Sequence, residues 1–178
     1  RRFVYRANRE VGDSPFEVIS VSRIEPKKGL LTLVEATQIL IRRGCQIRVH
    51  VVGTGDPGSP GSQEFAETFR SRLSEKRVED NFVLHGFKRQ DEIAAMLGRV
   101  HAFVAPYIQT ASGDQDVIPT SLLEAMASGL PSVTTDAGSI PEVIEQGVEG
   151  VIVQQNDSVG LADALEQLMS DAAGARAM

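Results

Sequence analysis

The sequence has little cysteine, no long apolar run and no surplus of positive charge. Its one cysteine, Cys45, cannot form a disulfide within the chain, which fits a reducing compartment such as the cytoplasm. No apolar run approaches the roughly 20 residues that a membrane-spanning helix needs, and no secretory signal precedes the first expected strand. The net charge of -6 and the lack of a basic stripe argue against nucleic acid as a partner.

A metal-binding pattern is also missing. None of the three histidines has the spacing of a metal ligand, and there is no cluster of cysteine and histidine. His50 and His101 lie inside expected strands, where a hydrogen-bonded structural histidine is the better interpretation. The sequence therefore predicts neither a bound metal nor another cofactor.

The composition that is present suits one α/β domain. Hydrophobic residues make up 42% of the 178 residues and charged residues 24%, and this length can bury a sizeable core. We expect a single domain over residues 1–178 with its core at about 16–169. The first residue is Arg1 rather than Met, so the chain is expected to be an excised piece of a longer protein.

Short runs rich in Val and Ile alternate with segments of helical spacing. Such alternation predicts a parallel sheet with helices on both faces, connected by right-handed crossovers. The expected fold class is α/β, a Rossmann-like doubly wound parallel sheet of about six strands, whose ligands bind beyond the carboxyl ends of the strands. Strands are expected at 17–22, 46–52, 81–85, 100–105, 131–134 and 150–153, and helices at 28–43, around 65–73, and at 91–97, 121–128, 139–146 and 161–169.

The first two strand-end loops offer candidate phosphate contacts. Arg23 and Lys28 follow the first strand near a helix start, and a diphosphate needs fixed cations and backbone N–H donors. The alternative is a solvated basic turn. Gly53, after the second strand, lets the backbone approach either a ligand or the next loop closely.

The third strand ends in Gly86 and Phe87. A glycine followed by a partly exposed aromatic ring could border a nucleobase. The alternative is a core phenylalanine beside a turn glycine.

The strongest segment lies between the fourth and fifth strands. Two carboxylates, Asp116 in a loop and Glu124 in a helix, flank the amides of Thr120 and Ser121 at the helix start. This arrangement predicts an anion site with a carboxylate on either side that can hold sugar hydroxyls. The alternative is a capping box formed by Ser121 and Glu124.

Several strings together resemble a known family. PTSLLEAMASGLPSVTTDAGSIPEVI is similar to the signature of the retaining GT-B glycosyltransferases of family 4, also called group 1. VSRIEPKKG, VVGTGDP, NFVLHGF, DEIAAML and AFVAPY follow the same family in the same order. The resemblance covers roughly residues 16–169 and matches only the C-terminal, donor-binding half of the GT-B fold.

The resemblance implies roles for the candidate residues on the nucleotide. Arg23 and Lys28 would bind the donor diphosphate, and Gly86 and Phe87 would border the base. Glu124 would hold the ribose hydroxyls. The donor is a nucleotide sugar, and the acceptor would be bound by an N-terminal domain that this chain lacks.

The resemblance also implies contacts to the sugar. Asp116 would bind hydroxyls of the transferred sugar, and the amides of Thr120 and Ser121 would face the phosphates. Asp116 and Glu124 are thus the candidate catalytic residues. The family usually has Glu where Asp116 stands, and Pro119 removes one amide donor from the helix start.

The function implied is that of a retaining glycosyltransferase in the full-length parent. It would transfer a hexose-type sugar from a nucleoside diphosphate to an acceptor hydroxyl in cell-envelope or exopolysaccharide assembly. The implied location is the cytoplasm, with peripheral association at the inner face of the membrane. The isolated domain is expected to be inactive. The alternative is a degenerate nucleotide-sugar-binding or regulatory module without transferase activity.

Overall fold

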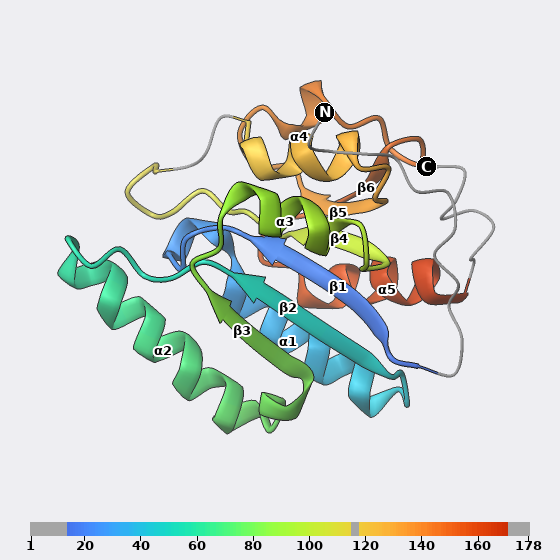
Figure 1. Ribbon diagram of the computed structural model, residues 1–178. Helices are drawn as coiled ribbons and strands as arrows, with labels where there is room; N and C mark the ends of the chain where they lie inside the picture. The colour runs from blue at the N-terminus through green and yellow to red at the C-terminus, as the bar shows by residue number, and fades with distance from the viewer. Residues whose placement is uncertain (1–13, 115–117, 171–178) are drawn as a thin grey trace.

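A computed structural model describes residues 14–114 and 118–170 (Figure 1). The described chain forms one six-stranded sheet in which every pairing is parallel, with the order β3-β2-β1-β4-β5-β6. The strands are β1 (Phe16–Val21), β2 (Ile47–Val52), β3 (Phe82–Gly86), β4 (Ala102–Ala105), β5 (Ser132–Thr135) and β6 (Gly150–Val153). The doubly wound, six-stranded α/β prediction is confirmed.

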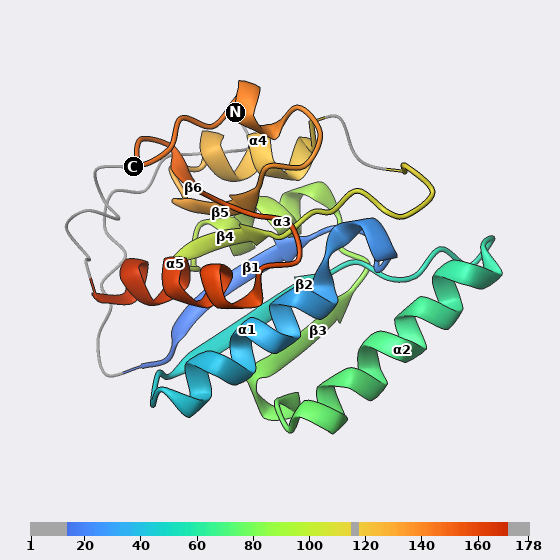
Figure 2. The same ribbon diagram turned by 180° about the vertical axis from the view of Figure 1, so that it is seen from behind.

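The helices divide unequally between the two faces of the sheet. They are α1 (Leu30–Arg42), α2 (Pro60–Lys76), α3 (Gln90–Leu97), α4 (Thr120–Ala127) and α5 (Ser158–Ser170). Figure 2 shows α1, α2 and α5 on one face, whereas Figure 1 shows α3 and α4 in front of the other. None of the described helices has the length and apolar character that crossing a bilayer requires.

Two buried clusters follow from this division. One lies under α1, α2 and α5 and includes Leu33, Val49 and Phe69. The other lies under α3 and α4 and includes Ile19, Phe103 and Leu122. Successive strand residues point to opposite faces, so the apolar strand runs supply side chains to both clusters.

Two predicted helices differ from the structure. The helix predicted to start at Lys28 starts instead at Leu30, as α1. Lys28 belongs to a 3-10 turn at Pro26–Lys28, and Gly29, with a left-handed φ of 62°, separates this turn from α1. The helix predicted at 139–146 is only a 3-10 turn at Ile140–Glu142. Beyond it, Gln146 forms an isolated bridge with Gly150 at the start of β6.

The sheet changes winding direction between β1 and β4. β1 leads to α1 on one face and β4 leads to α4 on the other, and ligands of doubly wound sheets bind at this point. The two strand-end loops touch there: the Ile108 amide donates to the Lys27 carbonyl at 2.9 Å. A Cβ atom on Gly29 would lie 1.6 Å from the Pro106 carbonyl oxygen, so only glycine allows this approach.

Candidate functional site

A chain of contacts links the loop after β1 to the start of α4. The Lys28 Nζ lies 5.1 Å from the centroid of the Tyr107 ring, within the range of a cation–π contact. The Tyr107 hydroxyl lies 3.3 Å from the Ser121 Oγ. The structure therefore brings Lys28 and Ser121, both predicted site residues, together through Tyr107 at the edge of the sheet where β1 and β4 end.

The first turn of α4 lies at this edge of the sheet, where Ser121 contacts Tyr107. Thr120 is the first helical residue, and Pro119 occupies the N-cap position without a side-chain hydrogen bond. The first helical bond at this end runs from the Leu122 amide to the Pro119 carbonyl at 3.0 Å. The amides of Thr120 and Ser121 precede it, and amides in this position favour an anion.

Glu124 lies one turn further along α4 and contacts another helix. Its Oε1 accepts a hydrogen bond from the Gln90 side-chain amide at the start of α3. Burial raises the pKa of the Glu124 carboxyl above its ordinary value, and the bond from Gln90 acts in the opposite direction. We call Lys28, Tyr107, Ser121, Glu124 and Gln90 the α4 site.

The capping-box alternative for this segment is wrong. Because α4 begins at Thr120, Ser121 is the second helical residue and not the N-cap.

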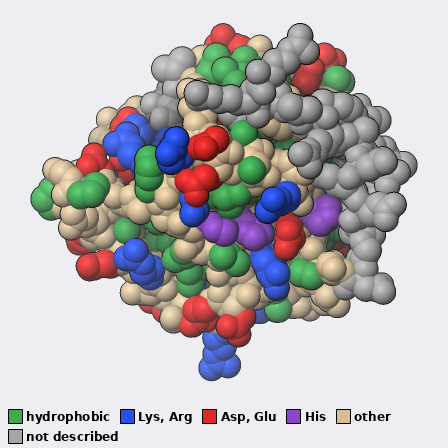
Figure 3. All heavy atoms as spheres, in the orientation of Figure 1, with side chains coloured by type: hydrophobic (Ala, Val, Ile, Leu, Met, Phe, Trp, Pro, Cys, Tyr) green, Lys and Arg blue, Asp and Glu red, His purple; other side chains and the backbone are tan. Residues whose placement is uncertain are grey.

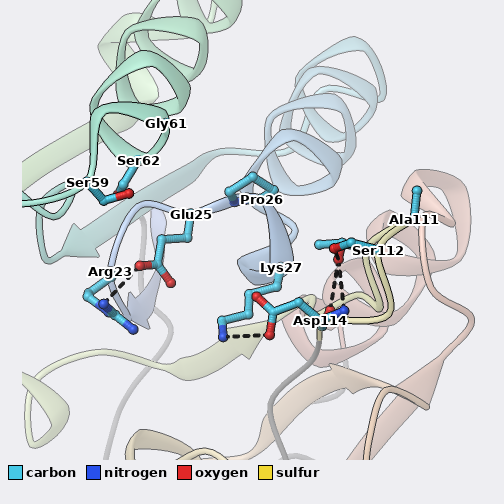
Figure 4. Close-up of a pocket in the computed structure, with 11 residues that line it drawn as sticks. Arg23, Glu25, Pro26, Lys27, Ser59, Gly61, Ser62, Ala111, Ser112 and Asp114 are labelled. Carbon is cyan, nitrogen blue, oxygen red and sulfur yellow. Dashed lines mark hydrogen bonds and ion pairs between the residues drawn. The ribbon is translucent and has the colours of Figure 1, made fainter.

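Arg23 lies against carboxylates. Its guanidinium is 3.0 Å from the Glu25 carboxylate and 3.4 Å from that of Asp56, and its side chain is 58% exposed. It borders a pocket of about 600 Å³, formed by the loop after β1, the start of α2 and the loop after β4 (Figure 4). We call this the side pocket; Lys28 and Glu124 do not line it.

Gly53 and Phe87, two further predicted site residues, differ in how closely they are packed. A Cβ on Gly53 would lie 1.9 Å from the Ser22 carbonyl oxygen, and the Gly53 amide donates to the Gly86 carbonyl at 2.8 Å. Of the two interpretations of Gly53, the geometry favours close contact with another loop. Phe87 is 79% exposed, so it is not the core residue of the alternative interpretation.

Asp116 lies outside the described residues, and its predicted contact with the sugar stays a prediction. The described loop before it is folded back on itself: the Thr110 amide donates to the Asp114 carbonyl at 2.9 Å. The Thr110 hydroxyl also accepts from the Asp114 amide at 3.1 Å.

The histidines form structural contacts on the face that Figure 1 presents, where Figure 3 shows their side chains at the surface. The His101 Nδ1 accepts the Glu17 amide at 2.9 Å, as the structural interpretation predicts. The His50 Nδ1 and the His85 Nε2 are 2.9 Å apart. Burial lowers the pKa of both His50 and His85. Within the described residues, no three potential ligands gather to hold a metal ion, and metal independence stays a prediction.

Sequence reasoning missed Tyr107 and Gln90. Tyr107 is buried and lies two residues beyond β4, at the edge where ligands bind. That position was a usable signal. Gln90 carries no such signal, because its role depends on the packing of α3 beside α4.

Comparison with known proteins decides the family. The family model described as "Glycosyl transferases group 1" matches residues 2–178. The chain belongs to this family. The chain is 36% identical over 166 residues to the putative colanic acid biosynthesis glycosyltransferase WcaL of Salmonella typhimurium. That match covers 93% of this chain and 39% of the relative, so this group 1 chain spans well under half of its relative's length.

Solved structures share the fold of this group 1 glycosyl transferase chain. Anabaena HepE in complex with UDP superposes with a TM-score of 0.79 at 22% identity, over 92% of this chain and 42% of that one. The C-terminal domain of a glycosyl transferase group 1 family protein, LpcC of Francisella tularensis, gives a TM-score of 0.76 at 23% identity. That match covers 92% of this chain and 81% of the solved domain. The group 1 family and the fold are thus confirmed, whereas the retaining mechanism stays a prediction.

Proposed function

We propose that residues 1–178 form the nucleotide-sugar-binding domain of a retaining glycosyltransferase. The parent protein would transfer a sugar from a nucleoside diphosphate to an acceptor hydroxyl. The bond from the anomeric carbon to the diphosphate breaks, a bond to the acceptor oxygen forms, and the products are the glycoside, a nucleoside diphosphate and a proton. The acceptor would be held by an N-terminal domain outside this chain.

The observation that supports this proposal most is the contact chain from Lys28 through Tyr107 to Ser121. It brings a cation to the amino end of a helix at the crevice where doubly wound sheets bind ligands. A diphosphate in the crevice would meet the Lys28 ammonium and the amides of Thr120 and Ser121. These groups stabilise negative charge as it develops on the departing diphosphate, without a metal ion.

The rest of the nucleotide sugar has candidate partners on either side. The Glu124 carboxylate, oriented by Gln90, would accept hydrogen bonds from the ribose hydroxyls. Gly86 and the exposed Phe87 would border the base. Arg23 would supply a second cation to the diphosphate, which would replace Glu25 or Asp56 as its partner, and Asp116 would contact the transferred sugar.

The proposed pathway is cell-envelope or exopolysaccharide assembly. This is supported by the colanic acid role in the name of the Salmonella relative, and donor binding is supported by the UDP in the HepE complex. The parent would act in the cytoplasm, at the inner face of the membrane. Cys45, an unpaired thiol, is compatible with that compartment.

The test is calorimetric titration of the chain with UDP, GDP and ADP. The base of the natural donor should give measurable binding, and Lys28→Ala and Glu124→Ala should each weaken it by about tenfold or more, since a hydrogen bond to a charged group contributes ~1.5–3 kcal/mol. Lys76→Ala is the matched control, because this lysine lies at the carboxyl end of α2 and pairs with Glu35 of α1. Equal affinities for all four proteins would refute the proposed site.

The full-length parent tests the reaction itself. An active enzyme releases nucleoside diphosphate from the nucleotide sugar in the presence of acceptor, and the product keeps the anomeric configuration. Binding without any transfer or hydrolysis would instead identify a degenerate module.

A further inference from the structure

The side pocket has no role in the proposed donor site beyond its border at Arg23. Its volume of about 600 Å³ lies within the ~300–1,000 Å³ that is usual for small-molecule sites. Figure 4 shows the side chains of Arg23, Glu25, Lys27 and Asp114 along its walls. The pocket is therefore large enough for a ligand of its own.

The charges in the side pocket compensate one another. The Arg23 guanidinium lies 3.0 Å from the Glu25 carboxylate, and the Lys27 Nζ lies 3.1 Å from the Asp114 carboxylate. The Asp56 carboxylate also lies 3.4 Å from Arg23, so among the described residues these cations carry no surplus positive charge that would attract an anion. An incoming phosphate would have to displace a carboxylate from its cation, so the pocket favours a neutral ligand.

The same groups leave unused hydrogen-bonding capacity. A carboxylate has about four acceptor positions and a guanidinium five N–H donors, so the pairs with Glu25 and Asp56 do not exhaust the donors of Arg23. The hydroxyls of Thr110 and Ser112, 2.9 Å apart, add further donors and acceptors on the wall formed by the loop after β4. Such mixed, charge-assisted partners match the hydroxyl groups of a saccharide, each of which both donates and accepts.

The position of the pocket relative to the α4 site suggests which saccharide it holds. Lys27 lines the side pocket and its neighbour Lys28 lies over Tyr107 in the α4 site. A ligand in the pocket would therefore sit beside the donor's diphosphate. We propose that the side pocket binds one neutral sugar unit of the acceptor, beside the part that the N-terminal domain would hold, an inference that rests on the proposed transferase function.

The test is amide-resolved NMR of the isotope-labelled chain. The probes are methyl glycosides of glucose, galactose and mannose, added with and without UDP or GDP. At least one glycoside should shift the amides of Ser59, Gly61 and Ser62 and those at 110–114 in a saturable manner. Inorganic phosphate is the opposing probe and should leave these amides unchanged.

A matched pair of variants locates the binding. Asp114→Asn should weaken the glycoside about tenfold, the loss typical of one hydrogen bond to a charged group. Asp163→Asn is the control: its carboxylate is also 59% exposed and ion-paired, but with Arg43 at the opposite end of α1. Equal effects of the two variants would overturn the proposal.

Two further outcomes would also overturn it. One is a complete lack of shifts from every glycoside, and the other is a phosphate-induced shift of the same amides. Failure of the donor proposal looks different, because then Lys28→Ala and Glu124→Ala leave nucleotide affinity unchanged while the Asp114 result is unaffected.

Discussion

The two faces of the sheet are covered in different ways. On one face lie helices of 13, 17 and 13 residues, α1, α2 and α5. On the other lie α3 and α4, with eight residues each. The long helices bury the larger apolar cluster, whereas the short helices contact each other through Gln90 at the start of α3 and Glu124 in α4. We infer that one face chiefly supplies stability and the other chiefly positions the site.

The largest expected effect is on the face of the long helices. Phe69 on α2 is fully buried and meets the Phe82 ring edge-on, with centroids 6.1 Å apart. Phe69→Ala should lower the free energy of unfolding by ~3–5 kcal/mol, because it leaves a cavity. Urea denaturation measures this loss. Nucleotide affinity of the folded fraction should not change, and a tenfold loss would contradict the division of roles.

A matched truncation on the other face should lower both the stability and the nucleotide affinity. Leu122 is fully buried under α4, directly after Ser121. Leu122→Ala should cost ~2–5 kcal/mol of stability and should also weaken nucleoside diphosphate binding several-fold, since the first turn of α4 loses its support. Denaturation and calorimetry on the same sample distinguish the two effects. Unchanged affinity would remove the distinction between the faces.

The contact between α3 and α4 predicts a pH effect on binding. Burial raises the pKa of Glu124 and the Gln90 bond lowers it, so Gln90→Leu should raise that pKa further. If the carboxylate binds the ribose, affinity falls as pH drops through this pKa. The fall should therefore begin at a higher pH in Gln90→Leu, as calorimetry across the acidic range would show. In Glu124→Gln the same fall should be absent.

The smallest expected effect concerns the His50–His85 pair on the face of the short helices. Burial lowers the pKa of both rings, so the folded state binds fewer protons than the unfolded state near the ordinary histidine pKa of about 6.5. Stability should thus be fully present above that pH and decline below it. A His50→Gln, His85→Gln variant should show a shallower decline in denaturation midpoints between neutral and acidic pH. An identical slope would exclude the pair as its source.

The fold was predictable because its signals are local. The apolar run predicted as a strand at 46–52 is observed as β2 at Ile47–Val52, and helical spacing located α1 within two residues at its start. The cap predicted at Ser121 failed on a two-residue difference, because the N-cap of α4 is Pro119. Propensity alone did not resolve that difference, because Pro119 also fits a helix start.

The candidate site was predictable only in part, because its contacts join distant segments. Lys28, Ser121 and Glu124 could be proposed from their positions after strands. Their partners could not, since Lys28 meets Tyr107 from another strand end and Glu124 meets Gln90 across 34 positions. The pairing of Arg23 with Asp56, 33 positions away, likewise depends on how the loops meet.

The approach of Gly29 to Pro106 has a consequence for how ligands would influence each other. Gly29 packs against the Pro106 carbonyl, and the Ile108 amide donates to the Lys27 carbonyl, so the loops after β1 and β4 are in direct contact at the sheet edge. Lys27, which lines the side pocket, and Lys28, which belongs to the α4 site, are neighbours in the loop held by this contact. Binding at either site would therefore order the same short stretch of backbone. The entropy cost of ordering it, once met by the first ligand, need not be met again by the second.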